Sequence, residues 1–178
     1  MICIFLTVVL CVHHQHIRAS KEVAELTVRF PHRSGGGGIT SGVIPGAVTV
    51  GTGSGTGALL QPAVSLSGLG DLVIQGELTF KADSDYQYKL NTKRGLGDQV
   101  MASGITIESG AAFEVRGVGN KKLTAGTIFV VLYNTTSTPT TGNFINLPNH
   151  ATLIVGKNSF QVNYKGGDGN DLTITVLP

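Results

Sequence analysis

Residues 160–178, FQVNYKGGDGNDLTITVLP, decide the fold class of this chain. Two runs of alternating apolar and polar residues flank a Gly/Asp/Asn turn at 166–171. A period of two residues broken by such a turn predicts a β-hairpin or the corner of a β-solenoid. The apolar members of the two runs are Phe160, Val162 and Tyr164, then Leu172, Ile174 and Val176.

The composition of the 178 residues fits a β-protein with many tight corners. Glycine accounts for 25 residues, while charged residues make up only 13% of the chain. The net charge of +2 and the lack of a basic stripe with stacking aromatics argue against nucleic-acid binding. Cys3 and Cys11 are the two cysteines, so the rest of the chain has neither a disulfide scaffold nor a cysteine metal site.

Residues 1–38 differ from the remainder. The apolar run 1–12 is too short to span a bilayer as a helix, and no basic residue precedes Arg18, unlike in an ordinary signal peptide. The four glycines at 35–38 are typical of a flexible linker. We therefore predict a disordered or weakly signal-like segment at 1–38 and a folded domain at 39–178.

An internal repeat runs through the folded part. Leu78 aligns with Ile105 at an offset of 27 (105 − 78), and Tyr86 aligns with Phe113 at the same offset. A looser copy begins at 48–50 and continues at 57–59. The same offset also pairs Phe80 with Ile107, Tyr88 with Val115, Asp71 with Asp98 and Val73 with Val100.

Repeats of 20 to 50 residues are typical of solenoids, in which each unit buries its apolar face against the next. We predict an all-β fold, a short right-handed parallel β-helix with a C-terminal β-hairpin cap; a β-sandwich or meander is the alternative. The apolar run 127–133 is expected to be a strand buried on both faces. The remaining residues to 178 are expected to close the stack.

The repeat frame and the end-piece resemble the C-terminal passenger region of bacterial autotransporter-associated β-strand-repeat proteins. The residues that carry the resemblance are the frame at 98–115, GNFINLP at 142–148 and GGDGNDLTITV at 166–176. The resemblance implies a right-handed parallel β-helix in a large secreted or surface-exposed protein with an adhesive or structural role. It further implies that this chain corresponds to the last piece of such a passenger.

The turn at 166–171 also fits the first six positions of a calcium-binding nonapeptide, G-G-x-G-x-D. Asp168 and Asp171 would supply the hard oxygen ligands that Ca²⁺ prefers. Against this, the apolar position of the motif falls on Thr173, and only one copy is present. The alternative is a corner in which Gly, Asp and Asn serve the backbone. These two aspartates are the metal candidates, and no catalytic or cofactor-binding residue is assigned.

Asp83 and Asp85 are spaced as a carboxylate pair on one strand face would be, and paired carboxylates can cleave glycans. Lys81 and Arg94 would be their basic partners. The pair lies between two strand signals, however, and the second repeat copy lacks it. A solvated turn is the favoured interpretation.

Four further motifs are interpreted as loop or disordered segments without a chemical role. His13-His14-x-His16 has imidazole spacing but no acidic partner, and His150 is isolated in the body of the chain. The glycine-rich run 51–57 precedes no helix that would bind phosphate. Asn134 begins a glycosylation sequon that we interpret as a polar loop.

The sequence therefore predicts a non-enzymatic, secreted or surface-exposed passenger fragment, structural or adhesin-like, located extracellularly or at the outer membrane. Alternatives are a β-helix that binds or acts on polysaccharides, and a truncated gene product without its own function. Expected partners are surface glycans or neighbouring passenger repeats, with self-association through an exposed apolar end of the solenoid. We expect no cofactor, nucleic acid or transmembrane span.

Overall fold

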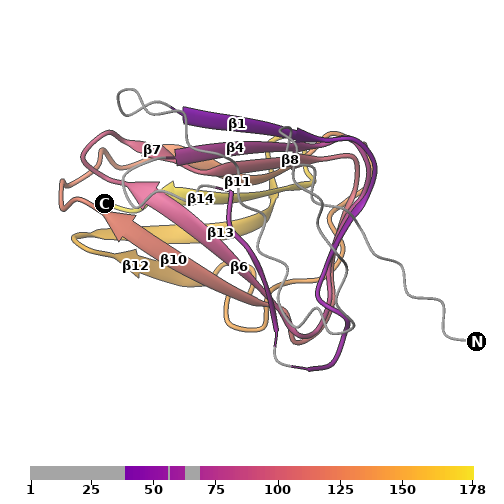
Figure 1. The fold of residues 1–178 in the computed structure, drawn as a ribbon. Coiled ribbons are helices and arrows are strands. Elements are labelled where there is room, and N and C mark those ends of the chain that lie inside the picture. Colours follow the sequence, from indigo (N-terminus) through magenta and orange to yellow (C-terminus); the bar gives the residue numbers. More distant parts are fainter. Residues whose placement is uncertain (1–38, 56, 63–68) are drawn as a thin grey trace, which may run out of the picture.

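The computed structural model describes residues 39–55, 57–62 and 69–178, and this part of the chain consists of β-strands and turns without any helix (Figure 1). None of these residues forms a helix long and apolar enough to cross a membrane. The predicted segment 1–38, with Cys3, Cys11, His13, His14 and His16, lies outside the described residues. In chain order the strands are β1 (Ile39–Ile44), β2 (Val48–Val50), β3 (Ala58–Leu60), β4 (Leu69–Ile74), β5 (Leu78–Phe80), β6 (Ser84–Asn91), β7 (Leu96–Gly97), β8 (Gln99–Ala102), β9 (Ile105–Ile107), β10 (Ala112–Val118), β11 (Ile128–Asn134), β12 (Thr152–Val155), β13 (Asn158–Gly166) and β14 (Asp171–Val176).

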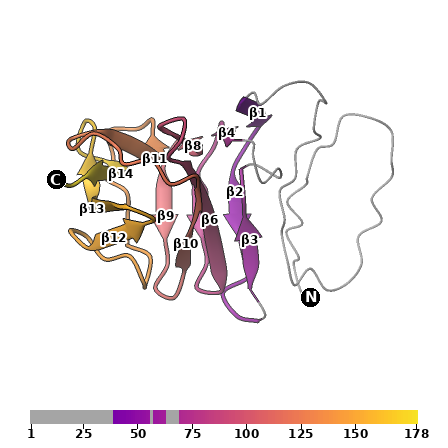
Figure 2. The ribbon, with the colours of Figure 1, turned by 90° about the vertical axis from the view of Figure 1, so that its left-hand side faces the viewer.

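The chain visits three sheets in turn and then returns to the first. β1, β4, β8 and β11 pair in parallel, as do β2, β5 and β9, and β3, β6 and β10. We call each visit to the three sheets a passage: β1–β3, β4–β6 and β8–β10. Figure 2 shows strands of successive passages side by side, with β12, β13 and β14 beyond the last of them.

The strand register confirms the 27-residue repeat in two sheets and corrects it in the third. Leu78 pairs with Ile105 and Tyr86 with Phe113, as predicted. Asp71, however, pairs with Gln99 rather than with Asp98. Likewise, Val73 pairs with Met101 rather than with Val100. The offset is 28 there (99 − 71) because three residues, 75–77, join β4 to β5, whereas only 103 and 104 join β8 to β9.

The looser first copy is also real, with its own spacing. Val48 pairs with Leu78, an offset of 30, and Ala58 pairs with Ser84, an offset of 26. The corners thus absorb insertions while the strands keep their register. This behaviour follows from burial, because a one-residue slip would turn every apolar side chain of a strand away from the core.

β11 is buried less completely than predicted. The side chain of Ile128 is 62% exposed, so one end of the strand faces solvent. Val131 and Leu132 are both fully buried although they are consecutive. A register shift between Val130 and Leu132 explains this, because a bulge turns the side chains after it to the opposite face.

The predicted C-terminal hairpin is confirmed. β13 and β14 pair antiparallel, with Phe160 opposite Val176 and Val162 opposite Ile174. β14 also pairs with β11, and β12 pairs with the other edge of β13. The three strands therefore extend the first sheet beyond its parallel part and bury the alternating side chains identified in the sequence.

The segment after β11 covers the last strands of the other two sheets. Thr141 bridges to Thr106 of β9, and the backbone N–H of Ile145 donates to the carbonyl of Ala111 at 2.8 Å. The amide of Asn146 replaces a strand for β10: it accepts from the N–H of Phe113 at 2.9 Å and donates to its carbonyl at 2.8 Å. Backbone groups that a missing strand would leave unpaired are thereby satisfied.

Aromatic side chains form the centre of the core. Phe80, Tyr86, Phe113 and Phe144 come from four different segments, and their ring centroids lie 5.2–6.1 Å apart. At the first passage, where we expected an exposed apolar end, Leu60 is 0% exposed and Val43 is 59% exposed. Self-association through that end remains a prediction.

Candidate functional site

The calcium candidates Asp168 and Asp171 differ in exposure. Asp168 lies on the surface, whereas Asp171 is only 2% exposed. The Oδ1 atom of Asp171 accepts a hydrogen bond from the backbone N–H of Asn134 at 2.9 Å. A side chain at Gly167 would overlap the Asp171 carboxylate, so glycine is required there. Asp171 thus secures the end of β11 against the turn at 166–171.

Burial raises the pKa of Asp171, the hydrogen bond from Asn134 partly offsets this, and the charge of Asp168 adds to the rise. The two carboxylates are therefore close enough to influence each other. Within the described residues, no group of three His, Cys, Asp or Glu side chains could hold a metal ion. Calcium binding at Asp168 and Asp171 stays a prediction.

The Thr-rich loop at 135–141 is fastened to the same turn. The hydroxyl of Thr140 donates to the carbonyl of Asn170 at 2.6 Å, and the side-chain amide of Asn170 donates to the carbonyl of Thr136. Asn134 is 1% exposed, and its amide donates to the carbonyl of Thr138 at 2.9 Å. The nitrogen of this sequon is buried and hydrogen-bonded, so it serves the loop instead of presenting an acceptor for glycan attachment.

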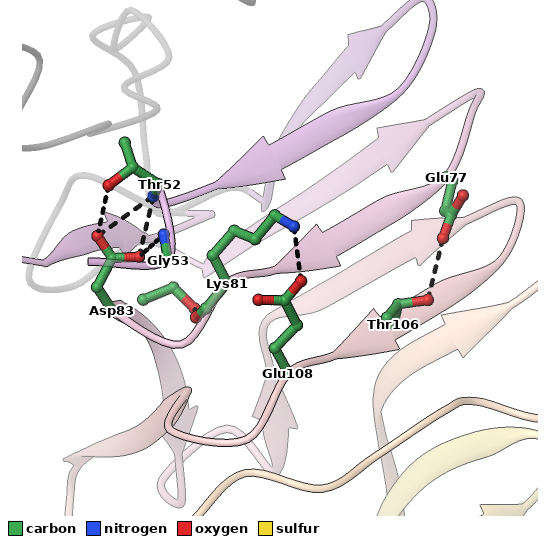
Figure 3. Close-up of polar contacts among 8 residues, drawn as sticks. Thr52, Gly53, Glu77, Lys81, Asp83, Thr106 and Glu108 are labelled. Atoms are coloured by element: carbon green, nitrogen blue, oxygen red, sulfur yellow. Dashed lines mark hydrogen bonds and ion pairs between the residues drawn. The ribbon is translucent and has the colours of Figure 1, made fainter.

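Asp83 lies in the half-exposed turn before β6, and its carboxylate also holds the glycine-rich loop of the preceding passage (Figure 3). Its Oδ1 accepts from the backbone N–H of Gly53 at 2.7 Å and from that of Thr52 at 2.9 Å. The Thr52 hydroxyl donates to Oδ2 at 3.1 Å. A side chain at Gly51 would overlap this carboxylate.

This arrangement explains why the run 51–57 is rich in glycine and why Asp83 occurs in only one copy of the repeat. Successive N–H groups in such a loop form a concavity that binds an anion, and here the anion is Asp83. Burial alone would raise the pKa of Asp83, but the hydrogen bonds from Gly53 and Thr52 together lower it. An aspartate held in this way is a stable anion and a poor general acid.

The remaining members of the proposed glycan-cleaving set do not come together. Asp85 is exposed at the start of β6, whereas Arg94 follows the end of that eight-residue strand. Lys81 forms an ion pair with Glu108 of the next passage at 2.6 Å, as Figure 3 shows. The structure therefore brings Asp83 together with a loop, and Lys81 together with Glu108.

His150 has a structural position. It has a positive φ of 63° and its backbone N–H donates to the carbonyl of Val162 at 2.9 Å. The carbonyl of the next residue, Ala151, accepts from the N–H of Val162 at 3.0 Å. Two consecutive residues thus pair with one, which is a bulge at the start of β12.

Sequence analysis missed the most unusual carboxylate, Asp98. It is 1% exposed, and its oxygens accept from the backbone N–H groups of Gly70 at 2.8 Å and Lys89 at 3.1 Å. Burial raises its pKa to about 6; the bond from Gly70 and the charge of Lys89 oppose this rise, and the charge of Asp71 adds to it. The signal in the sequence that could have pointed to Asp98 is its position as the first residue of the repeat frame, where it aligns with Asp71.

Tyr88 lies in the same region. Its hydroxyl is buried without a hydrogen-bond partner, and a side chain at Gly97, next to Asp98, would overlap it. Burial and then the charge of Asp98 raise the pKa of Tyr88 far above its ordinary range. Asp98 is thus a buried structural acid that links β4 and β6 to the start of β8.

Comparisons of the chain with protein-family models, with curated proteins and with solved structures find no match. The function of the chain is therefore inferred from its own contacts and sequence pattern.

Proposed function

We propose that residues 39–178 form the terminal piece of a right-handed parallel β-solenoid, acting as a non-enzymatic structural or adhesin-like passenger of a secreted or surface-exposed bacterial protein of the autotransporter type. The observation that carries this proposal is the closure of the last passage. Strand pairing continues in parallel from passage to passage and then stops at Asn146, Thr141 and β14.

Parallel stacking with buried side chains supports the solenoid part of the proposal. Connections between parallel strands of a sheet are right-handed in about 98% of cases, which favours the right-handed form. Terminal units of solenoids need caps, because an uncovered end leaves backbone groups unpaired. Asn158 adds to the cap: its amide bonds to the N–H of Leu123 at 2.7 Å and to the carbonyl of Lys121 at 2.9 Å.

The use of the polar side chains supports a non-enzymatic role. Asp83, Asp98 and Asp171 each accept hydrogen bonds from backbone N–H groups, and Glu108 is paired with Lys81. Groups held in this way stabilise corners. The resemblance of the repeat frame and end-piece to β-strand-repeat passengers supports location at the cell surface.

The test is fractionation of cells that produce the protein, followed by intact mass analysis of each fraction. A species carrying residues 39–178 in the medium or at the outer membrane supports the proposal. Recovery only inside the cell refutes the surface role. Hydrolysis of a polysaccharide by the full chain, lost on Asp85→Ala, would overturn the non-enzymatic role in favour of a glycan-cleaving β-helix.

A further inference from the structure

Six exposed basic side chains gather at one corner of the stack. They make up most of the nine Lys and Arg residues that the structure describes. They come from the turn after β6, from β10 and the segment after it, and from the turn between β12 and β13. We call them the basic corner: Lys93, Arg94, Arg116, Lys121, Lys122 and Lys157.

The first two of these segments are in direct contact. The N–H of Thr92 donates to the carbonyl of Val118 at 2.8 Å, and the hydroxyl of Thr92 accepts from the N–H of Lys121 at 3.3 Å. A Cβ atom at Gly119 would lie 3.0 Å from the backbone nitrogen of Lys93. The turn that carries Lys93 therefore stacks on the segment that carries Lys121.

The third segment adjoins the second. The amide of Asn158 bonds to both Lys121 and Leu123, and a Cβ atom at Gly156 would lie 3.3 Å from the side-chain oxygen of Asn120. In Figure 1 the arrowheads of β6 and β10 and the turn between β12 and β13 lie together at the left of the view. Three successive turns thus present basic residues in one row.

Four of the six basic side chains in this corner form no ion pair among the described residues. Arg116 has an acidic neighbour, Glu114, at 3.5 Å, and both are exposed. Within the described part of the chain, Lys93, Lys121, Lys122 and Lys157 make no ion pair. Like charges held on adjacent turns repel one another and create a positive potential that attracts anions.

We propose that the basic corner binds a linear anionic polysaccharide. The paired strands β6 and β10 lie about 4.8 Å apart and the β12–β13 turn adjoins the segment after β10, so the corner matches a polymer that carries charges at short intervals. Single-stranded nucleic acid fits less well because its bases need exposed aromatic rings, and each described Phe and Tyr ring is buried or half-buried. The choice of a glycan over duplex DNA rests on the proposed surface role; anion binding by the corner does not.

The experiment measures binding of the full chain to alginate, heparin, neutral dextran and a mixed-sequence DNA duplex over a series of salt concentrations. The test variant combines Lys93→Gln, Lys121→Gln, Lys122→Gln and Lys157→Gln. The matched control is Lys165→Gln, which removes an exposed lysine seven residues along β13 from Asn158, about 23 Å away at about 3.3 Å per residue. Circular dichroism checks that each variant folds.

We expect the chain to bind alginate or heparin and not dextran. The fourfold variant should lose at least about tenfold in affinity and show a weaker salt dependence, because fewer counterions are released on binding. The control should bind within about twofold of the wild type. Binding to alginate alone indicates uronate recognition, and binding to heparin alone indicates sulfate recognition; both support the proposal.

Four results would overturn it: no binding to alginate or heparin, equal binding to dextran, an equal loss in the Lys165→Gln control, or tighter binding to duplex DNA than to either glycan. These outcomes are separate from the test of surface location. A chain found at the surface that fails to bind the anionic glycans loses this proposal alone.

Discussion

The buried carboxylate of Asp98 makes the stability of this protein depend on pH in a direction opposite to that of a salt-bridged aspartate. Burial raises its pKa from the ordinary 3.8 to about 6 in the folded chain. The folded state therefore binds the proton more tightly than the unfolded state does. The resulting stability is fully present below pH 3.8 and is lost as the pH rises through about 6.

The magnitude follows from the difference of about 2.2 pKa units (6 − 3.8). At 1.36 kcal/mol per unit, the free energy of unfolding should fall by about 3 kcal/mol in total, from a pH well below 3.8 to a pH well above 6. Burial also raises the pKa of Asp71 and Asp171, so these carboxylates add a pH dependence of the same sign. The contribution of Asp98 must therefore be taken as the difference between the wild type and Asp98→Asn, which stays neutral at every pH.

The assay is urea unfolding followed by circular dichroism from pH 4 to pH 7.5. We expect the free energy of unfolding of the wild type, relative to Asp98→Asn, to decrease by about 2.4 kcal/mol from pH 4 to pH 7.5, because the rest of the effect lies below pH 4. Asp85→Asn, which removes an exposed carboxylate, controls for the loss of one acidic group. A difference that is constant with pH, or that grows in favour of the wild type, would refute the reasoning, since the hydrogen bonds from Gly70 and Lys89 would then outweigh burial.

Three further predictions concern corners. Asp83→Ala should speed amide hydrogen exchange at Thr52 and Gly53, which lose their acceptor, whereas Asp85→Ala should not. Equal exchange rates in the two variants would show that Asp83 does not hold this loop. Asn158→Ala should lower the free energy of unfolding by about 1–2 kcal/mol, because it leaves a half-buried N–H and C=O without partners; a loss below about 0.5 kcal/mol in urea titrations would contradict this. Gly126→Ala should lower the free energy of unfolding by about 1–2 kcal/mol for its positive φ alone, because nothing lies near its Cβ position. Gly142→Ala should lower it clearly more in the same titrations, because its Cβ would overlap the carbonyl of Ile107. Similar losses would show that the loop moves to accommodate the added methyl group.

The repeat could be predicted where side chains face the core. Leu78 and Ile105, like Tyr86 and Phe113, are apolar in both copies because each occupies an inward position of a parallel sheet. The register of the first sheet could not be predicted, since it depends on the length of one corner. Asp98 aligned with Asp71 by letter, but it lies just before its strand and bonds across to Gly70.

The candidate sites were harder to predict because their partners lie in other passages. Nothing local to Asp83 shows that the loop at 51–55 supplies its hydrogen-bond donors 30 and 31 residues away. The basic corner escaped notice for the same reason, since Lys93, Lys122 and Lys157 are far apart in the sequence. Their proximity follows from a strand register that the repeat alone specifies only in part.

The corners after β5 and those after β6 and β10 differ in whether their charged side chains are paired. This difference has an energetic consequence. After β5, the charged side chains are paired within the protein. Asp83 accepts hydrogen bonds from the loop at 51–55, and Lys81 forms an ion pair with Glu108. After β6 and β10, lysines accumulate on adjacent turns, where their mutual repulsion opposes folding. A polyanion that binds the folded chain removes that repulsion and stabilises the fold by mass action. Heparin or alginate should therefore raise the melting temperature of the wild type by clearly more than that of the fourfold Lys→Gln variant. Salt, which screens the same repulsion, should narrow the difference in melting temperature that the polyanion produces.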